Sequence, residues 1–295
     1  MSNSEEVQQL HSAEATHTWQ RIVELRLDPV RGKFDAAHLK EINRRIFQDL
    51  PGYGYDEVRP GQYRDPVSDG NDWVKTRLLE TVGVRSTVAY SSMDKAAQHQ
   101  LDRALVAADP SALSKLSTDD FVTAIGSIYS QVDHIHPFPD GNSRTLREFT
   151  RQLAEESGYK LDWERFNQTP AGRDILYIAR DLSVIEHCLP YIQDDVTKRD
   201  VLRTLDQFEG NRNLPALLQD VIEPLYEPSL EEQIKQQGAA TALLRQSLDT
   251  EEPSLEEQLK HYESGSYVVK VAAIKPVQSD QVFREADHEE PGMDD

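Results

Sequence analysis

The stretch His136-Pro-Phe-Pro-Asp140-Gly-Asn-Ser-Arg-Thr-Leu-Arg147 stands between two helical patterns and fixes the arrangement of the chain around it. Upstream, apolar residues recur at helical spacing from Thr118, a capping residue, to about Asp133. Downstream, a second helix is expected from near Asn142 to Gly158, where the glycine ends it. The sequence therefore predicts a helix, a loop and a second helix, with the loop directly against the start of the second helix.

The flanking sequence is mainly helical as well. Turn-forming residues between 51 and 72 predict a loop, and the β-branched segment Val84–Tyr90 is the best short strand of the first half. The polar residues 1–33 predict an N-terminal helical segment. Further helices are predicted, from apolar spacing, at residues 34–50, 96–107, 175–192 and 201–226.

The character of the chain changes beyond residue 226. Residues 227–235, EPSLEEQIK, recur almost unchanged at 252–260 as EPSLEEQLK, and each copy has a capping box that starts a helix. Residues 267–274 form a candidate strand, and the acidic last dozen residues are expected to be disordered. We therefore expect residues 201–295 to be a helical, partly disordered extension, either a duplicated helical hairpin or a partner-binding tail.

Composition excludes several classes of function. The net charge of −20 excludes nucleic acid as a partner, because binding phosphate backbones requires the opposite sign. No apolar run approaches the roughly 20 residues of a membrane helix, and the N-terminus lacks the features of a secretory signal. The single cysteine, Cys188, excludes an internal disulfide and is expected to pack in the core. A cytoplasmic protein without a membrane anchor is the expectation.

The loop has the features of an anion site. Unpaired amides at a helix start, together with the positive end of the helix dipole, attract anions. Gly141, Asn142 and Ser143 can present successive backbone N–H groups as a phosphate nest. Arg144 and Arg147 are three residues apart and so share one helix face. Two cations near a helix start are unfavourable unless an anion lies between them and the amides, which indicates a polyphosphate ligand.

Two further residues of the loop suggest chemistry. Asp140 is a hard oxygen ligand beside the nest, as Mg²⁺ requires, and His136 can act as a general base near neutral pH. Each feature alone also fits a structural interpretation, such as a packed histidine or an ordinary Asp-Gly-Asn turn. His134 and His136 form an H-x-H pair that could bind zinc, but no further ligand set is evident. We expect His134 to pack at the end of the preceding helix.

The loop resembles the signature of the Fic family, H-P-F-x-[DE]-G-N-G-R-x-x-R. The matching positions are His136, Pro137, Phe138, Asp140, Gly141, Asn142, Arg144 and Arg147. A looser resemblance runs from about residue 35 to 200 and includes Arg59-Pro-Gly-Gln-Tyr-Arg64. It implies a mainly α fold, a helical bundle with a small β-hairpin flap. The expected catalytic domain is residues 34–200, between an N-terminal segment, 1–33, and the extension, 201–295.

The resemblance implies a protein adenylyltransferase that moves AMP from ATP to a Ser, Thr or Tyr hydroxyl. His136 would deprotonate this hydroxyl, which attacks the α-phosphate and expels pyrophosphate. Asp140 would hold Mg²⁺, and Phe138 would anchor the loop. The flap is expected near Val84–Tyr90, where it would dock the target protein by strand addition. The implied ligands of the phosphates are Gly141, Asn142 and Ser143 as the anion hole, and Arg144 and Arg147 as a clamp on the β- and γ-phosphates.

One position departs from the signature. Ser143 replaces the second glycine, and relatives with lysine there phosphorylate their targets instead. Serine is small, keeps its backbone N–H and adds a hydroxyl that could donate to phosphate, so AMP transfer from ATP remains the expectation. The alternatives are a kinase-like transfer, a different nucleotide donor, and a nucleotide-binding module without catalysis. The intact His136 argues against the last of these.

The resemblance also bears on regulation. Many family members are inhibited by a glutamate that pairs with the second arginine of the signature, here Arg147. The chain has no full match to the inhibitory pattern, but Glu209 in Phe208-Glu-Gly-Asn211 is a candidate. An antitoxin-like partner protein is the other expected inhibitor. The resemblance fits both a toxin that acts in its own cell and an effector translocated into a host cell.

Overall fold

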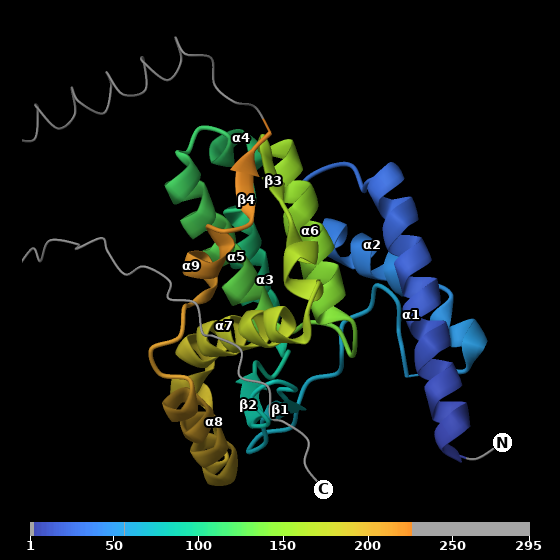
Figure 1. Cartoon of the computed structure of the whole chain (residues 1–295), viewed down its shortest axis with the longest axis vertical. Coiled ribbons are helices and arrows are strands. Elements are labelled where there is room, and N and C mark those ends of the chain that lie inside the picture. Colours follow the sequence, from blue (N-terminus) through green and yellow to red (C-terminus); the bar gives the residue numbers. More distant parts are fainter. Residues whose placement is uncertain (1–2, 56, 226–295) are drawn as a thin grey trace, which may run out of the picture. The chain divides into compact units, whose positions relative to one another are not determined.

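The computed structural model describes residues 3–55 and 57–225 (Figure 1). This part is mainly helical with a small antiparallel β-hairpin, which confirms the predicted fold class. The predicted repeat helices, the strand at 267–274 and the acidic end lie outside the described residues. The described elements are α1 (Asn3–Leu27), α2 (Ala36–Phe47), η1 (Leu50–Tyr53), β1 (Trp73–Leu78), β2 (Arg85–Tyr90), α3 (Lys95–Val106), α4 (Pro110–Leu113), α5 (Thr118–Ile135), α6 (Asn142–Glu156), β3 (Tyr159–Leu161), η2 (Trp163–Asn167), α7 (Pro170–Cys188), η3 (Leu189–Tyr191), α8 (Asp195–Gln207), α9 (Leu214–Leu218) and β4 (Ile222–Pro224).

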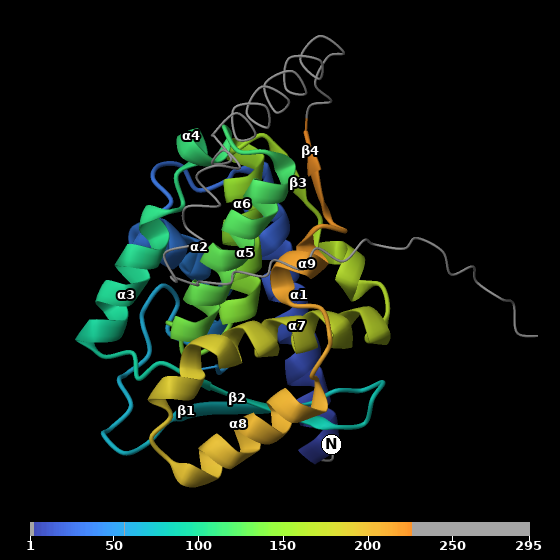
Figure 2. The same ribbon diagram turned by 90° about the vertical axis from the view of Figure 1, so that its left-hand side faces the viewer.

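Helices α5 and α6 form the centre of the molecule (Figures 1 and 2). Helix α5 packs against α3, α7 and α9, and its apolar stripe is almost fully buried, as in Phe121 and Ile125. The predicted cap is displaced by one residue. Ser117, rather than Thr118, accepts the hydrogen bond from the N–H of Asp120, and Thr118 is the first helical residue.

The N-terminal helices cover the other side of α6. Helix α2 begins after Asp35, whose carboxylate caps the N–H groups of Ala37 and His38, and it packs on α6. Helix α1 packs along α2, and Arg21 on α1 forms an ion pair with Asp49 at 2.6 Å. The first helix is thereby fixed on the bundle through side-chain contacts to the chain that follows it.

The hairpin consists of β1 and β2, paired from Trp73 with Tyr90 to Leu78 with Arg85. Strand β2 confirms the predicted strand at 84–90, whereas β1 was not predicted. Helices α7 and α8 cover β2, which is buried over nearly its whole length (Figure 2). Strand β1 alternates between partly buried and exposed residues, and in the described chain β2 is its only strand neighbour.

The segment after residue 200 is less helical than predicted. Helix α8 ends at Gln207, shortly before Gly210, whose φ of +83° is outside the helical region, and only the short helix α9 follows from Leu214. The chain then forms β4, which pairs with β3 in a second two-stranded sheet. These elements contact α5, α7 and β2, so residues 201–225 pack on the chain before them. Among the helices of residues 3–55 and 57–225, none is long and apolar enough to cross a bilayer.

Candidate active site

His136 ends α5 in a strained conformation. Its φ of +51° is in the left-handed region, which is uncommon for a residue other than glycine. The side chain is 5% exposed, and its ring lies 3.9 Å from the ring of Tyr90 on β2. Burial lowers the pKa of His136 to about 4, so the imidazole is neutral at physiological pH. A neutral imidazole is the protonation state that a general base requires.

Arg64 stabilises the left-handed conformation of His136. Its buried guanidinium donates to the carbonyl oxygen of His136 at 2.8 Å and also to those of Ile135 and Ser91. The same guanidinium lies over the ring of Trp73 on β1, 4.6 Å from its centroid. Arg64 therefore connects the loop after α5 to the hairpin. Arg64 lies in a segment whose sequence resembles the Fic family, but the sequence did not predict that it connects the loop to the hairpin.

The loop is closed by Asn142. The N–H of Phe138 donates to the side-chain oxygen of Asn142 at 2.9 Å, and the amide nitrogen of Asn142 donates to the Phe138 carbonyl at 2.7 Å. Phe138 itself is 1% exposed, so its ring is an anchor in the core. Because the side chain of Asn142 is used inside the loop, only its backbone N–H is available to a ligand.

Gly141 precedes α6 and no side chain caps this helix. The φ of Gly141 is +74°, and a Cβ atom there would lie 2.0 Å from Cζ of Phe47. The position therefore requires glycine both for its backbone angle and for the space beside it. No side chain caps the amides at the start of α6, which is the condition that the predicted anion site requires.

The Ser143 side chain contacts α7. Its hydroxyl accepts a hydrogen bond from Nη1 of Arg180 on α7 at 3.0 Å. The hydroxyl is therefore directed toward the protein and is engaged there, while the backbone N–H remains at the helix start. Arg180 in turn forms a buried ion pair with Asp133, at 2.9 Å.

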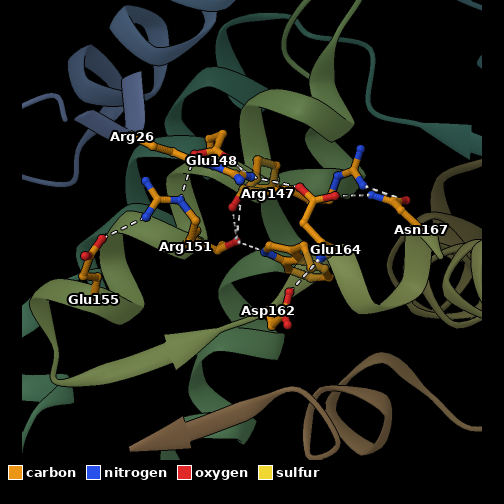
Figure 3. Close-up of polar contacts among 11 residues, drawn as sticks. Arg26, Arg147, Glu148, Arg151, Glu155, Asp162, Glu164 and Asn167 are labelled. Carbon is orange, nitrogen blue, oxygen red and sulfur yellow. Dashed lines mark hydrogen bonds and ion pairs between the residues drawn. The ribbon is translucent and has the colours of Figure 1, made fainter. Parts of the chain in front are cut away.

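The two arginines after the loop line one cavity of about 260 Å³ between α1, α6 and η2. Arg144 donates to Glu14 of α1 at 2.6 Å and lies over the ring of Phe47. Arg147 approaches the side-chain oxygen of Asn167 at 3.4 Å. Figure 3 shows that Asn167 and Glu164 connect Arg147 to Arg26 of α1. The shared helix face predicted for Arg144 and Arg147 is observed.

Asp140 is the candidate metal ligand. Its side chain is half exposed and lies 3.7 Å from Arg144, beside the uncapped start of α6. The described residues hold no group of three His, Cys, Asp or Glu side chains that could bind a metal by themselves. One exposed carboxylate beside a phosphate site fits Mg²⁺, which is usually bound by one or two carboxylates together with substrate phosphates and water.

The other sequence candidates lie apart from this site. The ring of His134 lies 5.9 Å from that of His187, whereas the ring of His136 lies 3.9 Å from that of Tyr90, so the H-x-H pair does not converge. Glu209 is exposed after α8, and within the described chain no hydrogen bond or ion pair joins it to Arg147. Cys188 is buried in an apolar cluster, as predicted.

Comparison with known proteins gives a family for this arrangement. A sequence model of the Fic/DOC family matches residues 33–154. The chain is similar to the protein adenylyltransferase VbhT of Bartonella schoenbuchensis, with 29% identity over 70% of this chain and 36% of that protein. It is also similar to a protein adenylyltransferase of Bartonella henselae, with 23% identity over 65% of this chain and 34% of that protein. The chain thus spans about a third of the length of these two curated relatives.

A solved structure of the N-terminal Fic domain of a VirB-translocated Bep effector protein from Bartonella quintana is also similar. The identity is 22%, the match covers 77% of this chain and 89% of that chain, and the TM-score is 0.47. The residues of the loop, its geometry and the family match all fall within the same segment. Residues 33–154, the segment that contains the loop, are similar to the Fic/DOC family.

Proposed function

We propose that the protein is a protein adenylyltransferase, which moves AMP from ATP to a Ser, Thr or Tyr hydroxyl of a target protein. The observation that carries the proposal is the buried, neutral imidazole of His136 beside the uncapped start of α6. A base next to an anion site is what hydroxyl attack on a phosphate requires. The adenylyltransferase names of the two Bartonella relatives support the same reaction.

In this proposal His136 takes the proton of the acceptor hydroxyl. The hydroxyl oxygen forms a bond to the α-phosphorus, the bond from this phosphorus to the bridging oxygen breaks, and pyrophosphate leaves. Burial matters because it keeps His136 unprotonated at physiological pH and removes water that would compete as acceptor. The adjacent ring of Tyr90 limits how far the imidazole can rotate.

The start of α6 would bind the phosphates. The backbone N–H groups of Gly141, Asn142 and Ser143 form the proposed anion hole, and Arg144 and Arg147 the clamp on the β- and γ-phosphates. Both guanidinium groups line the 260 Å³ cavity, which supports a shared ligand. Asp140 would hold Mg²⁺, which supplies charge neutralisation across the phosphates when bound.

The target segment would bind at the hairpin. The sequence placed the flap near Val84–Tyr90, but α7 and α8 cover β2, so the docking strand is β1 in the present proposal. The outer edge of β1 lacks a strand neighbour in the described chain, and an extended peptide can add to such an edge. Val74 and Leu78 are exposed on β1 and offer apolar contacts to that peptide.

The competing function is a kinase-like transfer on the same fold, which depends on Ser143. The Ser143 hydroxyl accepts a hydrogen bond from Arg180, which holds this side chain against α7. This arrangement favours AMP transfer. With the side chain held by Arg180, the backbone N–H groups of the nest are as open as in relatives that have glycine at this position. Three further predictions rest on the resemblance alone. They are a different donor nucleotide, an antitoxin-like inhibitor and translocation into a host cell.

The test uses the full chain with Mg²⁺, a cell lysate as source of targets, and ATP labelled at either the α- or the γ-phosphate. We expect label from α-labelled ATP in protein, and none from γ-labelled ATP. His136→Ala should abolish incorporation and keep nucleotide binding in calorimetry, whereas the matched variant His134→Gln should remain active. Transfer of the γ-label would indicate a kinase, and nucleotide binding without any transfer would indicate a binding module.

A further inference from the structure

A cluster of buried charged side chains lies near His136. Asp133 of α5 and Arg180 of α7 are each 2% exposed, and Asp181 of α7 is 1% exposed. The guanidinium of Arg180 binds both carboxylate oxygens of Asp133, at 2.9 to 3.1 Å. Asp181 forms a second ion pair with Arg77 of β1, at 3.2 Å. Burying ion pairs has a large desolvation cost, and apolar residues can often replace them without loss of stability. Stability alone therefore does not explain why these ion pairs are buried.

The first of these pairs touches two residues of the site. Oδ1 of Asp133 lies 3.8 Å from Nδ1 of His136, and Nη1 of Arg180 donates to the Ser143 hydroxyl. Neither ring nitrogen of His136 has a hydrogen-bond partner in the described chain, and both are buried. A buried imidazole without a partner has no fixed tautomer, yet a base must present one particular nitrogen to its substrate. Asp133 offers a carboxylate oxygen as an acceptor on the Nδ1 side of the ring.

We propose that the Asp133–Arg180 pair positions the general base. Asp133 accepts the Nδ1–H of His136, which leaves Nε2 as the basic nitrogen, and Arg180 offsets the charge of Asp133 so that the imidazole stays neutral in the resting protein. This inference rests on the proposed role of His136 as base. The present 3.8 Å is too long for a hydrogen bond, and catalytic hydrogen bonds commonly shorten when substrate binds. Through Ser143, Arg180 also fixes the anion hole relative to the base.

The charges around His136 set the direction of the test. The groups that face it are Lys75 of β1, Tyr90 of β2, Asp133 of α5 and Arg180 of α7. Burial lowers the pKa of His136, Lys75 and Arg180 lower it further, and only Asp133 raises it. Burial opposes ionisation of Asp133, but Arg180 and the His136 ring outweigh it and lower the Asp133 pKa to about 2. Removing Arg180 should therefore raise the His136 pKa, and removing Asp133 should lower it.

The experiment follows the ring of His136 by NMR in full-length protein with labelled histidine, assigned with His136→Ala. In Arg180→Gln we expect the His136 pKa to rise by about one unit or more. In Asp133→Asn we expect a lower pKa and a shift of the nitrogen resonances toward a mixture of tautomers. In both variants kcat should fall by about tenfold or more, with KM for ATP within about twofold of wild type.

Two further variants keep the test decisive. If Asp133→Asn leaves Arg180 unpaired and does not fold, Asp133→Asn/Arg180→Gln removes both charges and keeps polar side chains at both positions. Its His136 pKa should return toward the wild-type value while the tautomer mixture and the low kcat persist. Asp174→Asn is the control, because Asp174 is a buried carboxylate on the same helix that binds Thr81 outside this cluster. It should leave the His136 resonances unchanged.

Folded variants whose His136 titration and tautomer match wild type would overturn the inference and leave the ion pair as a structural element only. Altered titration in a protein that shows no transfer with wild-type sequence would instead overturn the proposed function. The NMR readout does not depend on turnover, so the two failures are distinguishable.

Discussion

The guanidinium of Arg144 donates a hydrogen bond of 2.6 Å to the carboxylate of Glu14. The two residues lie 130 positions apart, on α6 and α1, and their side chains are 26% and 18% exposed. Arg144 is the first arginine of the proposed phosphate clamp. A carboxylate at this distance occupies the guanidinium that a phosphate would contact, so Glu14 and the nucleotide compete for the same donor.

The first prediction follows from this competition. Glu14→Gln should bind Mg²⁺ and a non-hydrolysable ATP analogue about fivefold more tightly, equivalent to about 1 kcal/mol, measured by calorimetry. Glu155→Gln is the matched control, since it removes the same charge from a partner of Arg151 on α6 outside the clamp. Equal affinities for Glu14→Gln and wild type would mean that phosphate does not use Arg144.

The second prediction concerns Gly141. Gly141→Ala should lower the free energy of unfolding by more than about 3 kcal/mol, because the added Cβ meets the buried ring of Phe47 at a positive φ. Gly70→Ala is the control for the backbone angle alone, since Gly70 has a φ of +82° and open space around it. It should cost about 1 kcal/mol in the same denaturant titration. Equal losses would show that the loop moves away from Phe47 at little cost.

The third prediction is a pH dependence of stability. Burial lowers the pKa of both His134 and His136 from 6.5 to about 4. Between these values the unfolded chain binds protons that the folded chain does not, so the free energy of unfolding should fall as pH decreases from about 6.5 through about 4. Urea titrations at several pH values measure this slope.

A histidine substitution tests the origin of this slope. His134→Gln should make the decline shallower, because one of the two buried imidazoles is gone. His99→Gln, at an exposed position on α3, should leave it unchanged. An identical slope in all three proteins would assign the pH dependence to other groups.

The fourth prediction concerns Arg64. Arg64→Met should leave several buried carbonyl oxygens around His136 without a donor, which lowers the free energy of unfolding by about 2 to 4 kcal/mol and reduces kcat. Arg59→Met is the control in the same loop, because the ion pair of Arg59 with Asp65 is exposed. Its effect should stay within about 0.5 kcal/mol. Thermal unfolding and AMP-transfer kinetics measure both quantities. Similar values for both variants would mean that the loop keeps its conformation without Arg64.

Local sequence patterns predicted the features that depend on neighbours in the chain. Apolar spacing predicted α5 and α6. The three-residue spacing of Arg144 and Arg147 predicted that they share a helix face, and both line one cavity. Strand β1 escaped notice because its alternation combines apolar residues with long cations such as Lys75 and Arg77, which individually favour no strand. Its pairing with the predicted β2 is what makes it a strand.

Contacts between distant residues were not predictable in the same way. Arg64 and His136 are 72 positions apart, and Arg180 and Asp133 are 47 apart, so no spacing rule relates them. An isolated arginine in a sequence gives no indication of whether it binds carbonyl oxygens, a carboxylate or water. The Ser143 hydroxyl is an example, since the sequence gave no indication that it accepts a hydrogen bond from Arg180.

Helix α1 has a practical consequence for anyone who trims the protein. The family match begins at residue 33, after α1 has ended at Leu27. Yet Arg26 of α1 binds the carboxylate of Glu148, which is only 4% exposed, and Glu14 binds Arg144. A fragment cut at the family boundary would leave Glu148 with Arg151 as its remaining described ion-pair partner and would strip one wall from the arginine cavity. Affinities measured on such a fragment would describe a different pocket from that of the longer chain.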